Sequence, residues 1–172
     1  MNSYCKTLLF YACEIRNESI IQYLVEQGAD LNKEDKNNET PLFCACKNGN
    51  KAIVKYLVEQ RADINKINKF NKTVLFYACE RGKEEVVKYL VGHGADINKL
   101  DNKGKTPLLY VCEGGNKAVI KYLVENGANI NKKDKDDEIP LFYGCKRGKE
   151  TLVKFLVDYG ADVNIINMIK HH

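Results

Sequence analysis

Long apolar segments are missing from this sequence. No stretch reaches the roughly 18–20 apolar residues that a membrane-spanning helix needs, so we expect no membrane partner. The amino terminus, MNSYCKTLLF, lacks the charged leader, apolar run and cleavage site of a secretory signal. The net charge of +4 is too mild to imply nucleic acid or a membrane surface. We therefore expect a cytoplasmic protein, with the nucleus as the alternative compartment.

Histidine is also scarce, which limits the chemistry that the chain can perform. Two of the three histidines are the last two residues, so His93 is the only internal one. No Ser-His or Cys-His pair can be assembled plausibly around it, and we expect it at a helix end, where a polar or cationic side chain is favourable. No C-x-x-C, H-E-x-x-H or acidic calcium loop occurs. We predict no enzymatic activity, no metal site and no cofactor.

Cysteine, in contrast, is present at a regular interval. Five of the seven cysteines, Cys13, Cys46, Cys79, Cys112 and Cys145, lie 33 residues apart. This regularity indicates a repeat rather than crosslinks, because neighbouring helices pack about 8–10 Å apart and a disulfide needs Cα atoms within about 7 Å. We predict that these thiols are small buried groups in the place of alanine. A redox-sensing role for one of them is the alternative.

The same interval extends across almost the whole chain. The segments YLVE and GADLN, with close variants of each, recur every 33 residues, and no residue is inserted or lost across five copies. We interpret residues 1–172 as a single domain. Its repeats are expected at about residues 2–34, 35–67, 68–100, 101–133 and 134–166, with a tail at 167–172.

Each copy has the pattern of two short helices and a turn. In the second copy, Thr40 is expected to accept a hydrogen bond from an early backbone N–H, and Pro41 suits the first helical position. Gly49 can take the left-handed conformation that ends this helix, and a second helix is predicted from about Lys51 to Gln60. Two helices of roughly ten residues are marginal alone in water. We therefore expect the copies to stack and bury a shared apolar surface.

The text TPLFCACKNGNKAIVKYLVEQRADIN resembles the ankyrin repeat, whose pattern is T-P-L-H-x-A with G-A-D-V-N near the end. The resemblance covers all five copies and implies an all-α solenoid of stacked helix-turn-helix units with projecting hairpin-like turns. It also implies a non-catalytic protein-binding module. The family's His, which ties neighbouring backbone by hydrogen bonds, is replaced by side chains that can only pack: Phe10, Phe43, Phe76, Leu109 and Phe142. We expect such departures to make the copies somewhat less stable.

The resemblance further implies that a partner binds a concave surface made of turn tips and one face of each first helix. Residues at these positions vary among the copies, whereas the scaffold text does not. Phe70 is the best single candidate, because a Phe at a turn tip has no obvious packing role; a contact with the neighbouring tip is the alternative. The predicted partner-binding residues are Lys36, Asn37, Lys47, Lys69, Phe70, Lys72, Tyr77, Arg81, Asn102, Lys103, Lys105, Tyr110, Tyr143, Lys146 and Arg147.

Tyrosine also follows the interval, three residues before one of the helix positions. The row is Tyr11, Cys44, Tyr77, Tyr110 and Tyr143. Tyrosine is enriched in binding hot spots, so the row is either the floor of a groove or packing between repeats.

Basic side chains outnumber acidic ones over the predicted surface. This excess suggests a partner protein with some acidic character, whereas nucleic acid would call for a clustered basic stripe. The alternative function is a structural spacer or scaffold within a longer repeat array. The terminal copies lack the polar outer face that usually ends a solenoid, so self-association through these ends is a further expectation.

Overall fold

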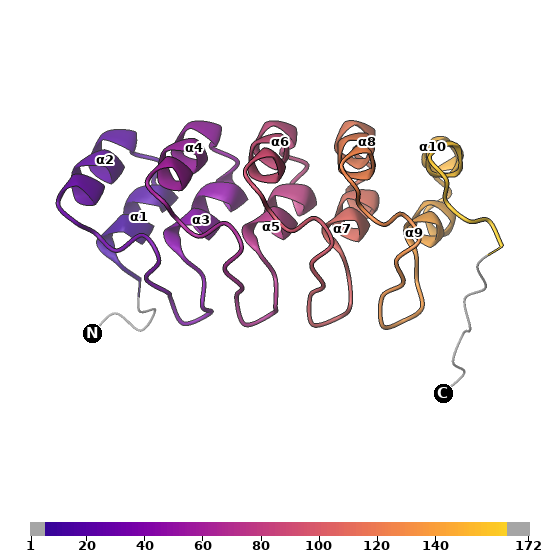
Figure 1. Ribbon diagram of the computed structural model, residues 1–172, viewed down its shortest axis with the longest axis horizontal. Coiled ribbons are helices and arrows are strands. Elements are labelled where there is room, and N and C mark those ends of the chain that lie inside the picture. The colour runs from indigo at the N-terminus through magenta and orange to yellow at the C-terminus, as the bar shows by residue number, and fades with distance from the viewer. Residues whose placement is uncertain (1–5, 165–172) are drawn as a thin grey trace.

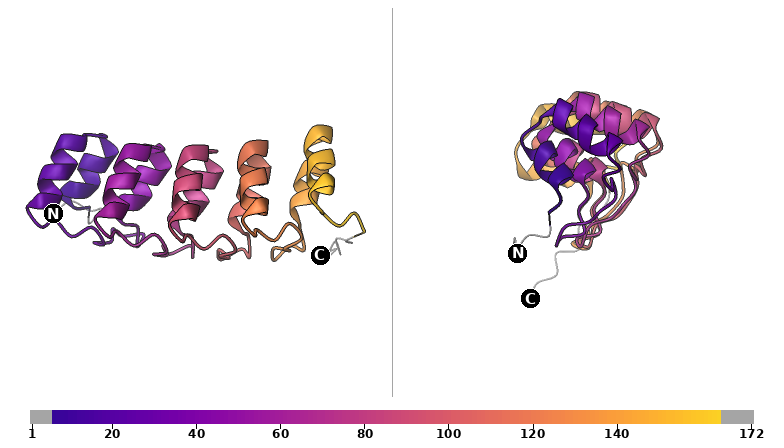
Figure 2. Two further views of the ribbon diagram at one scale, coloured as in Figure 1. Left: turned by 45° about the horizontal axis from the view of Figure 1, so that its top comes forward. Right: turned by 90° about the vertical axis from the view of Figure 1, so that its left-hand side faces the viewer.

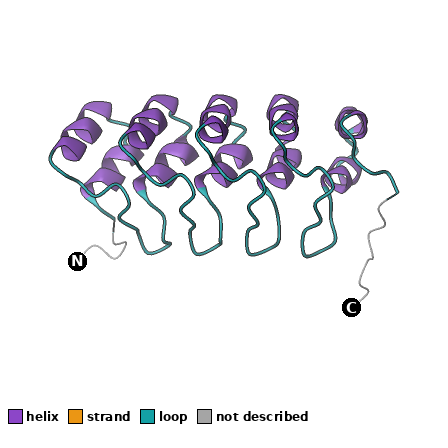
Figure 3. Ribbon diagram, in the orientation of Figure 1, coloured by secondary structure: helices purple, strands orange, loops and turns teal. Residues whose placement is uncertain are grey.

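The computed structural model describes residues 6–164, and this part of the chain contains helices and loops but no strand (Figure 3). The predicted all-α architecture is confirmed. The helices are α1 (Leu8–Glu14), α2 (Glu18–Glu26), α3 (Pro41–Asn48), α4 (Lys51–Glu59), α5 (Val74–Glu80), α6 (Glu84–Gly92), α7 (Pro107–Gly114), α8 (Lys117–Glu125), α9 (Pro140–Lys146) and α10 (Glu150–Asp158).

The helices lie in two rows, with a row of loops beside them (Figure 1). The inner row, α1, α3, α5, α7 and α9, adjoins the loops, and the outer row consists of α2, α4, α6, α8 and α10. Each inner helix contacts its neighbours in the row and the outer helix that follows it in sequence. Seen along the array, the loops all project in the same direction away from the helices (Figure 2). The chain is therefore a solenoid of helix pairs.

Asparagine side chains cap the start of α2, α4 and α8, whereas Lys83 and Lys149, which precede α6 and α10, make no capping hydrogen bond. Asn50 Oδ1 accepts a hydrogen bond from Ile53 N at 3.2 Å, and Asn17 and Asn116 cap α2 and α8 in the same way. The inner helix α3 begins at Pro41 and ends at Asn48, and it is followed by the C-cap Gly49, whose φ of 68° is left-handed, as the sequence predicts.

Thr40 stands at the N-cap position of α3 as predicted, but the predicted hydrogen bond to its side chain is absent. Its Oγ1 is buried without a hydrogen-bond partner, as is that of Thr73, whereas Thr7 and Thr106 do cap their helices. Phe43 N donates to the backbone carbonyl of Thr40 at 2.9 Å, but Leu109 N makes the same bond to the Thr106 carbonyl while also reaching Thr106 Oγ1, so the backbone bond does not account for the difference.

The core is continuous along the stack and consists mainly of side chains at the interfaces between repeats. Phe43 and Phe76 are its two largest fully buried side chains. Each packs edge to face against a tyrosine of the following repeat, with ring centroids 5.8 Å apart for Phe43 and Tyr77 and 5.6 Å for Phe76 and Tyr110. These phenylalanines replace a hydrogen-bonding histidine of the repeat pattern with aromatic packing.

The cysteines at the repeat interval are buried except for the last. Cys13, Cys46, Cys79 and Cys112 are buried free thiols, as predicted. Cys145 is exposed, so the prediction is wrong at this position. The other four lie beneath the next repeat, and the described part of the chain has no helix beyond α10 to cover Cys145.

Asparagine side chains add hydrogen bonds between successive repeats. Asn98 Nδ2 donates to the Gly127 carbonyl at 2.9 Å, and Asn98 Oδ1 accepts from Asn129 N at 3.0 Å. Asn65 and Asn131 make the equivalent pair of bonds to the repeats that follow them. One side chain thus satisfies a donor and an acceptor of the neighbouring backbone, which fixes the repeat-to-repeat spacing.

Candidate functional site

Each loop tip within residues 6–164 is closed by a buried acid or amide at the same place in the repeat. Asp101 Oδ1 accepts hydrogen bonds from Lys103 N at 2.8 Å and from Lys105 N at 2.9 Å, and the Asp101 amide donates to the Lys105 carbonyl. A short polar side chain that binds its own backbone in this way defines a tight turn. The same arrangement occurs at Asp35, Asn68 and Asp134.

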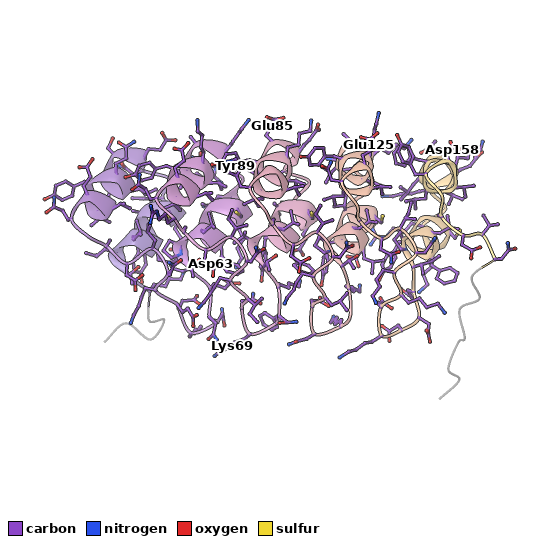
Figure 4. All side chains as sticks on the ribbon, in the orientation of Figure 1. Asp63, Lys69, Glu85, Tyr89, Glu125 and Asp158 are labelled. Carbon is purple, nitrogen blue, oxygen red and sulfur yellow. The ribbon has the colours of Figure 1, made fainter. Side chains whose placement is uncertain are left out.

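The tips are also bonded to one another in a row. Asn102 N donates to the Phe70 carbonyl at 3.0 Å, and Lys69 and Lys135 make the equivalent bond to Asn37 and Lys103 of the preceding tips. Lys69 lies at the free end of its loop, on the opposite side of the molecule from Glu85 of α6 (Figure 4). The predicted tip residues therefore form one continuous edge, with backbone positions fixed by hydrogen bonds.

The tyrosine row connects the inner helices to these tips. Tyr110 OH donates to Asp101 Oδ2 at 2.7 Å, and Tyr143 OH donates to Asp134 Oδ2 at 3.3 Å. Both rings are 8% exposed, and burial, followed by the hydrogen bond to Asp101, raises the pKa of Tyr110. The two side chains pack within the structure and present only a small part of each ring to the surface.

Tyr77 takes part in a related network, in which the carboxylate comes from the preceding repeat and the tip residue is a neutral amide. Its hydroxyl donates to Glu39 Oε1 at 3.0 Å and accepts from Asn68 Nδ2 at 2.8 Å. Asn68 Nδ2 also lies 3.0 Å from Glu39 Oε1. Burial, and then the charge of Glu39, raise the pKa of Tyr77. Here an amide at the tip is paired with a glutamate from the preceding repeat.

Ion pairs join the tips to the inner helices, across eight residues of sequence. They neutralise three predicted binding residues, Lys47, Lys105 and Lys146, while the polarity of the pair reverses from copy to copy. The pairs are Lys6–Glu14, Lys47–Glu39, Lys105–Glu113 and Lys146–Glu138.

The third repeat differs from the others at this place. Lys72 and Glu80 have opposite charges at the same spacing, yet neither forms an ion pair with another described residue. The Lys72 ammonium lies 4.1 Å from the centroid of the Tyr110 ring, within the range of a cation–π contact. Glu80 is exposed, so its carboxylate is open to a ligand.

A hollow of about 380 Å³ lies beside this carboxylate, between the third and fourth repeats. Phe70 forms part of its wall and remains 54% exposed. Aromatic rings and charged groups of both signs surround the space. The lining residues are Phe70, Lys72, Tyr77, Glu80, Asp101, Asn102, Lys103 and Tyr110.

A second hollow, of about 260 Å³, lies between the first and second repeats. Cys44 stands there at the place that tyrosine has in the other copies, and Asp35 therefore has no phenol beside it. Burial raises the pKa of the Cys44 thiol to about 11, so the thiol stays protonated and unreactive at neutral pH. The predicted residues Lys36, Asn37 and Lys47 line this space.

The predicted binding residues have different surroundings in the structure: some line the larger hollow, and others form contacts between repeats. Phe70, Lys72, Tyr77, Asn102, Lys103 and Tyr110 surround the larger hollow. Arg147, in contrast, donates to the Glu113 carbonyl at 2.8 Å and so contacts the preceding repeat. Glu80 was one of the acidic positions of the predicted face but was not among the predicted partner-binding residues. The recurring pairs of opposite charge eight residues apart were the signal that could have marked it.

His93 and the acidic and sulfur side chains of residues 6–164 are the other groups considered for chemistry in the sequence. His93 stands at the end of α6, with Nδ1 2.8 Å from the Tyr89 carbonyl, as predicted. Over the same residues, no group of three or more His, Cys, Asp or Glu side chains could hold a metal ion. Nor is any described helix both long and apolar enough to span a membrane.

Comparison with known families agrees with the repeat, the helix pairs and the tips. The family model for ankyrin repeats (3 copies) matches residues 9–101 and again residues 75–167. No curated protein sequence matches the chain significantly. The two family matches overlap and together extend over nearly all of the sequence. The chain belongs to the ankyrin-repeat family.

Proposed function

We propose that this chain is a non-catalytic module that binds a partner protein across the row of tips and the inner helices. Ankyrin repeats are generally protein–protein interaction modules. The single observation that carries the proposal is Phe70, a large apolar ring held at the edge of a hollow with more than half of its surface in water. Burying a Phe side chain contributes about 1.5–3 kcal/mol, which favours a partner that covers it.

The charges around Phe70 indicate what such a partner would present. Lys69, Arg81 and Lys103 make no ion pair with a described residue, whereas Lys47, Lys105 and Lys146 are paired within their own repeats. Acidic side chains of the partner would therefore meet the tips, which is consistent with a partner of acidic character. Charges at such an exposed rim mainly steer association and fix orientation.

At the larger hollow the negative charge of Glu80 favours a basic side chain on the partner, in contrast to the lysines of the tips. A bound segment would place an apolar side chain against Phe70 and a basic side chain toward Glu80. Acidic side chains next to these would face Lys69 and Lys103. This pattern of apolar, basic and acidic positions is more selective than net charge alone.

A structural spacer or scaffold is the second candidate function. The equivalent hydrogen bonds that Asn65, Asn98 and Asn131 make across successive interfaces favour it, because a spacer needs only a regular, stiff array. For either function we place the protein in the cytoplasm or nucleus. Its buried, unpaired thiols are consistent with a reducing compartment.

Selection of peptides from a displayed random library on the purified chain tests the binding proposal. The bound peptides should share an apolar residue next to acidic ones. Phe70→Ala should raise their Kd by roughly tenfold, since a hot spot contributes more than about 1 kcal/mol. Lys103→Glu should weaken binding further at low salt. The control is Lys88→Glu, the same charge change on the outer helix α6. Peptides that bind wild type and both site variants equally well would refute binding at this face.

A further inference from the structure

The first repeat exposes apolar side chains that are buried at the same positions elsewhere. Leu8 is 75% exposed, whereas Val74, at the equivalent position of the third repeat, is fully buried. Ile20 is 43% exposed, whereas Ile53 is 1% exposed. In the inner repeats these positions pack against the preceding repeat. The α1–α2 end of the solenoid is therefore one half of a repeat interface.

The α9–α10 end shows the complementary half. Cys145 is exposed, although the cysteines at its position in the four preceding repeats are buried. Val163 is exposed, whereas Ile130 at the same position is buried. In the inner repeats these positions pack beneath the following repeat. Each end thus carries the apolar surface that the other end would cover.

The polar groups of the two ends match in the same register. At an inner interface, Asn131 Nδ2 donates to the Gly160 carbonyl and Asn131 Oδ1 accepts from Asp162 N. Asn164 has the position of Asn131 in the last repeat, and no such bond to it occurs among the described residues. At the opposite end, Gly28 and Asp30 carry the carbonyl and the amide that this side chain would bind.

A tyrosine supplies a second matched pair. Tyr122 OH donates to the Lys88 carbonyl of the preceding repeat at 3.4 Å. Tyr23 has the same position in the first repeat and is exposed. The carbonyl of Lys154, on α10, corresponds to that of Lys88. Donor and acceptor therefore stand at opposite ends of one chain.

We propose that the chain binds a second copy of itself head to tail, with the α9–α10 end of one copy against the α1–α2 end of the next. The occupant follows from the matching: the apolar positions, the asparagine bonds and the tyrosine bond all find their complements on the same molecule, in one register. Such an interface is heterologous and leaves one end of each dimer uncovered, so association continues beyond the dimer. It extends the row of tips and uses none of the residues around Phe70.

Two end variants and one control test the proposal in the full chain under reducing conditions. Ile20→Glu places a charge on the first end, and Cys145→Glu places one on the last, at exposed positions that leave the fold intact. Ile67→Glu is the matched control, because Ile67 is 40% exposed but lies within the array. Circular dichroism verifies the fold of each variant, and sedimentation velocity measures the association.

Wild type and Ile67→Glu should associate into species larger than dimers as concentration rises. Each end variant alone should weaken association by roughly tenfold or more, because an unpaired charge would be buried. An equimolar mixture of the two end variants should form dimers and nothing larger, since each retains one intact end. Wild-type chain that stays monomeric, or a control variant that weakens association as much as Ile20→Glu, would overturn the proposal. Because no other protein is present, the result is independent of the proposed peptide binding.

Discussion

The interior and the two ends of this solenoid contain almost the same residues in different surroundings. Ile20 and Ile53 occupy one position in successive repeats, yet the first is exposed and the second buried. Cys112 and Cys145 differ in the same way at the other end. Burial here is thus decided by whether a neighbouring repeat is present, as expected when stability comes from interfaces between repeats. Interactions within one repeat should be indifferent to position along the array.

The largest predicted difference between interior and end involves the two isoleucines. Ile53→Ala should lower the free energy of unfolding by about 2–5 kcal/mol, because it leaves a cavity between repeats. Ile20→Ala should cost about 0.5 kcal/mol or less, as exposed substitutions usually do. Urea unfolding at low protein concentration, where copies do not associate, measures both. Equal losses would show that the first repeat stabilises the fold through Ile20 without a preceding neighbour.

A contact inside the repeat should not show this difference. Tyr110→Phe and Tyr143→Phe each remove the phenol that donates to the tip acid, Asp101 or Asp134, of its own repeat. Each change should cost about 1–3 kcal/mol, because a buried carboxylate oxygen loses its donor. The two losses should be similar although one repeat is interior and the other terminal. A loss confined to Tyr110→Phe, measured by the same urea titration, would contradict this expectation.

The asparagines between repeats should again distinguish the interior from the end. Asn98→Ala removes two exposed hydrogen bonds to the next repeat and should cost about 1–2 kcal/mol. Asn164→Ala should leave the stability of a single copy unchanged. It should nevertheless raise the concentration needed for association, which sedimentation velocity can measure separately from unfolding.

Much of this fold could be predicted from the sequence, because its repeat determines it. The interval set the helix pairs, and Gly49 and His93 stand at helix ends as their chemistry requires. Features that depend on a neighbouring repeat were harder to predict. Cys145 repeats the sequence position of its buried equivalents but not their surroundings. Thr40 Oγ1 accepts no capping hydrogen bond whereas Thr106 Oγ1 does, a difference that residue type, the same at both positions, could not predict.

The candidate site was predicted in part for the same reason. Tip residues such as Phe70 vary between copies, and this variation marked them. The tyrosine hydroxyls could be placed only when the tip acids lay beside them. The position of Lys72 over the Tyr110 ring, which opens Glu80 to solvent, depends on a side-chain conformation rather than on residue types.

The charged residue that ends a tip, Glu39 or Lys105, stands beside the acid or amide of the next tip. This contact gives the smallest predicted difference in stability between the interior and the end. Glu39 contacts an amide at the following tip, Asn68. Lys105 instead lies near Asp134, the acid of the following tip. Burial raises the pKa of Asp134, and the positive charge of Lys105 opposes part of that increase. Glutamate is thus found next to a neutral tip and lysine next to a charged one, because two carboxylates at this distance would repel each other.

Reversing an ion pair should therefore matter in the interior and not at the end. The double change Lys105→Glu with Glu113→Lys keeps the pair but places a carboxylate beside Asp134, and it should cost about 1 kcal/mol. Adding Asp134→Asn should restore most of that loss, because it reproduces the Glu39–Asn68 arrangement. The same reversal at Glu138 and Lys146, where no following tip occurs among the described residues, should change stability by less than about 0.5 kcal/mol. The ion pair survives in both double variants. A loss of stability only in the interior variant would therefore isolate the effect of the next repeat. Equal losses in the two variants would instead assign the cost to the ion pair itself.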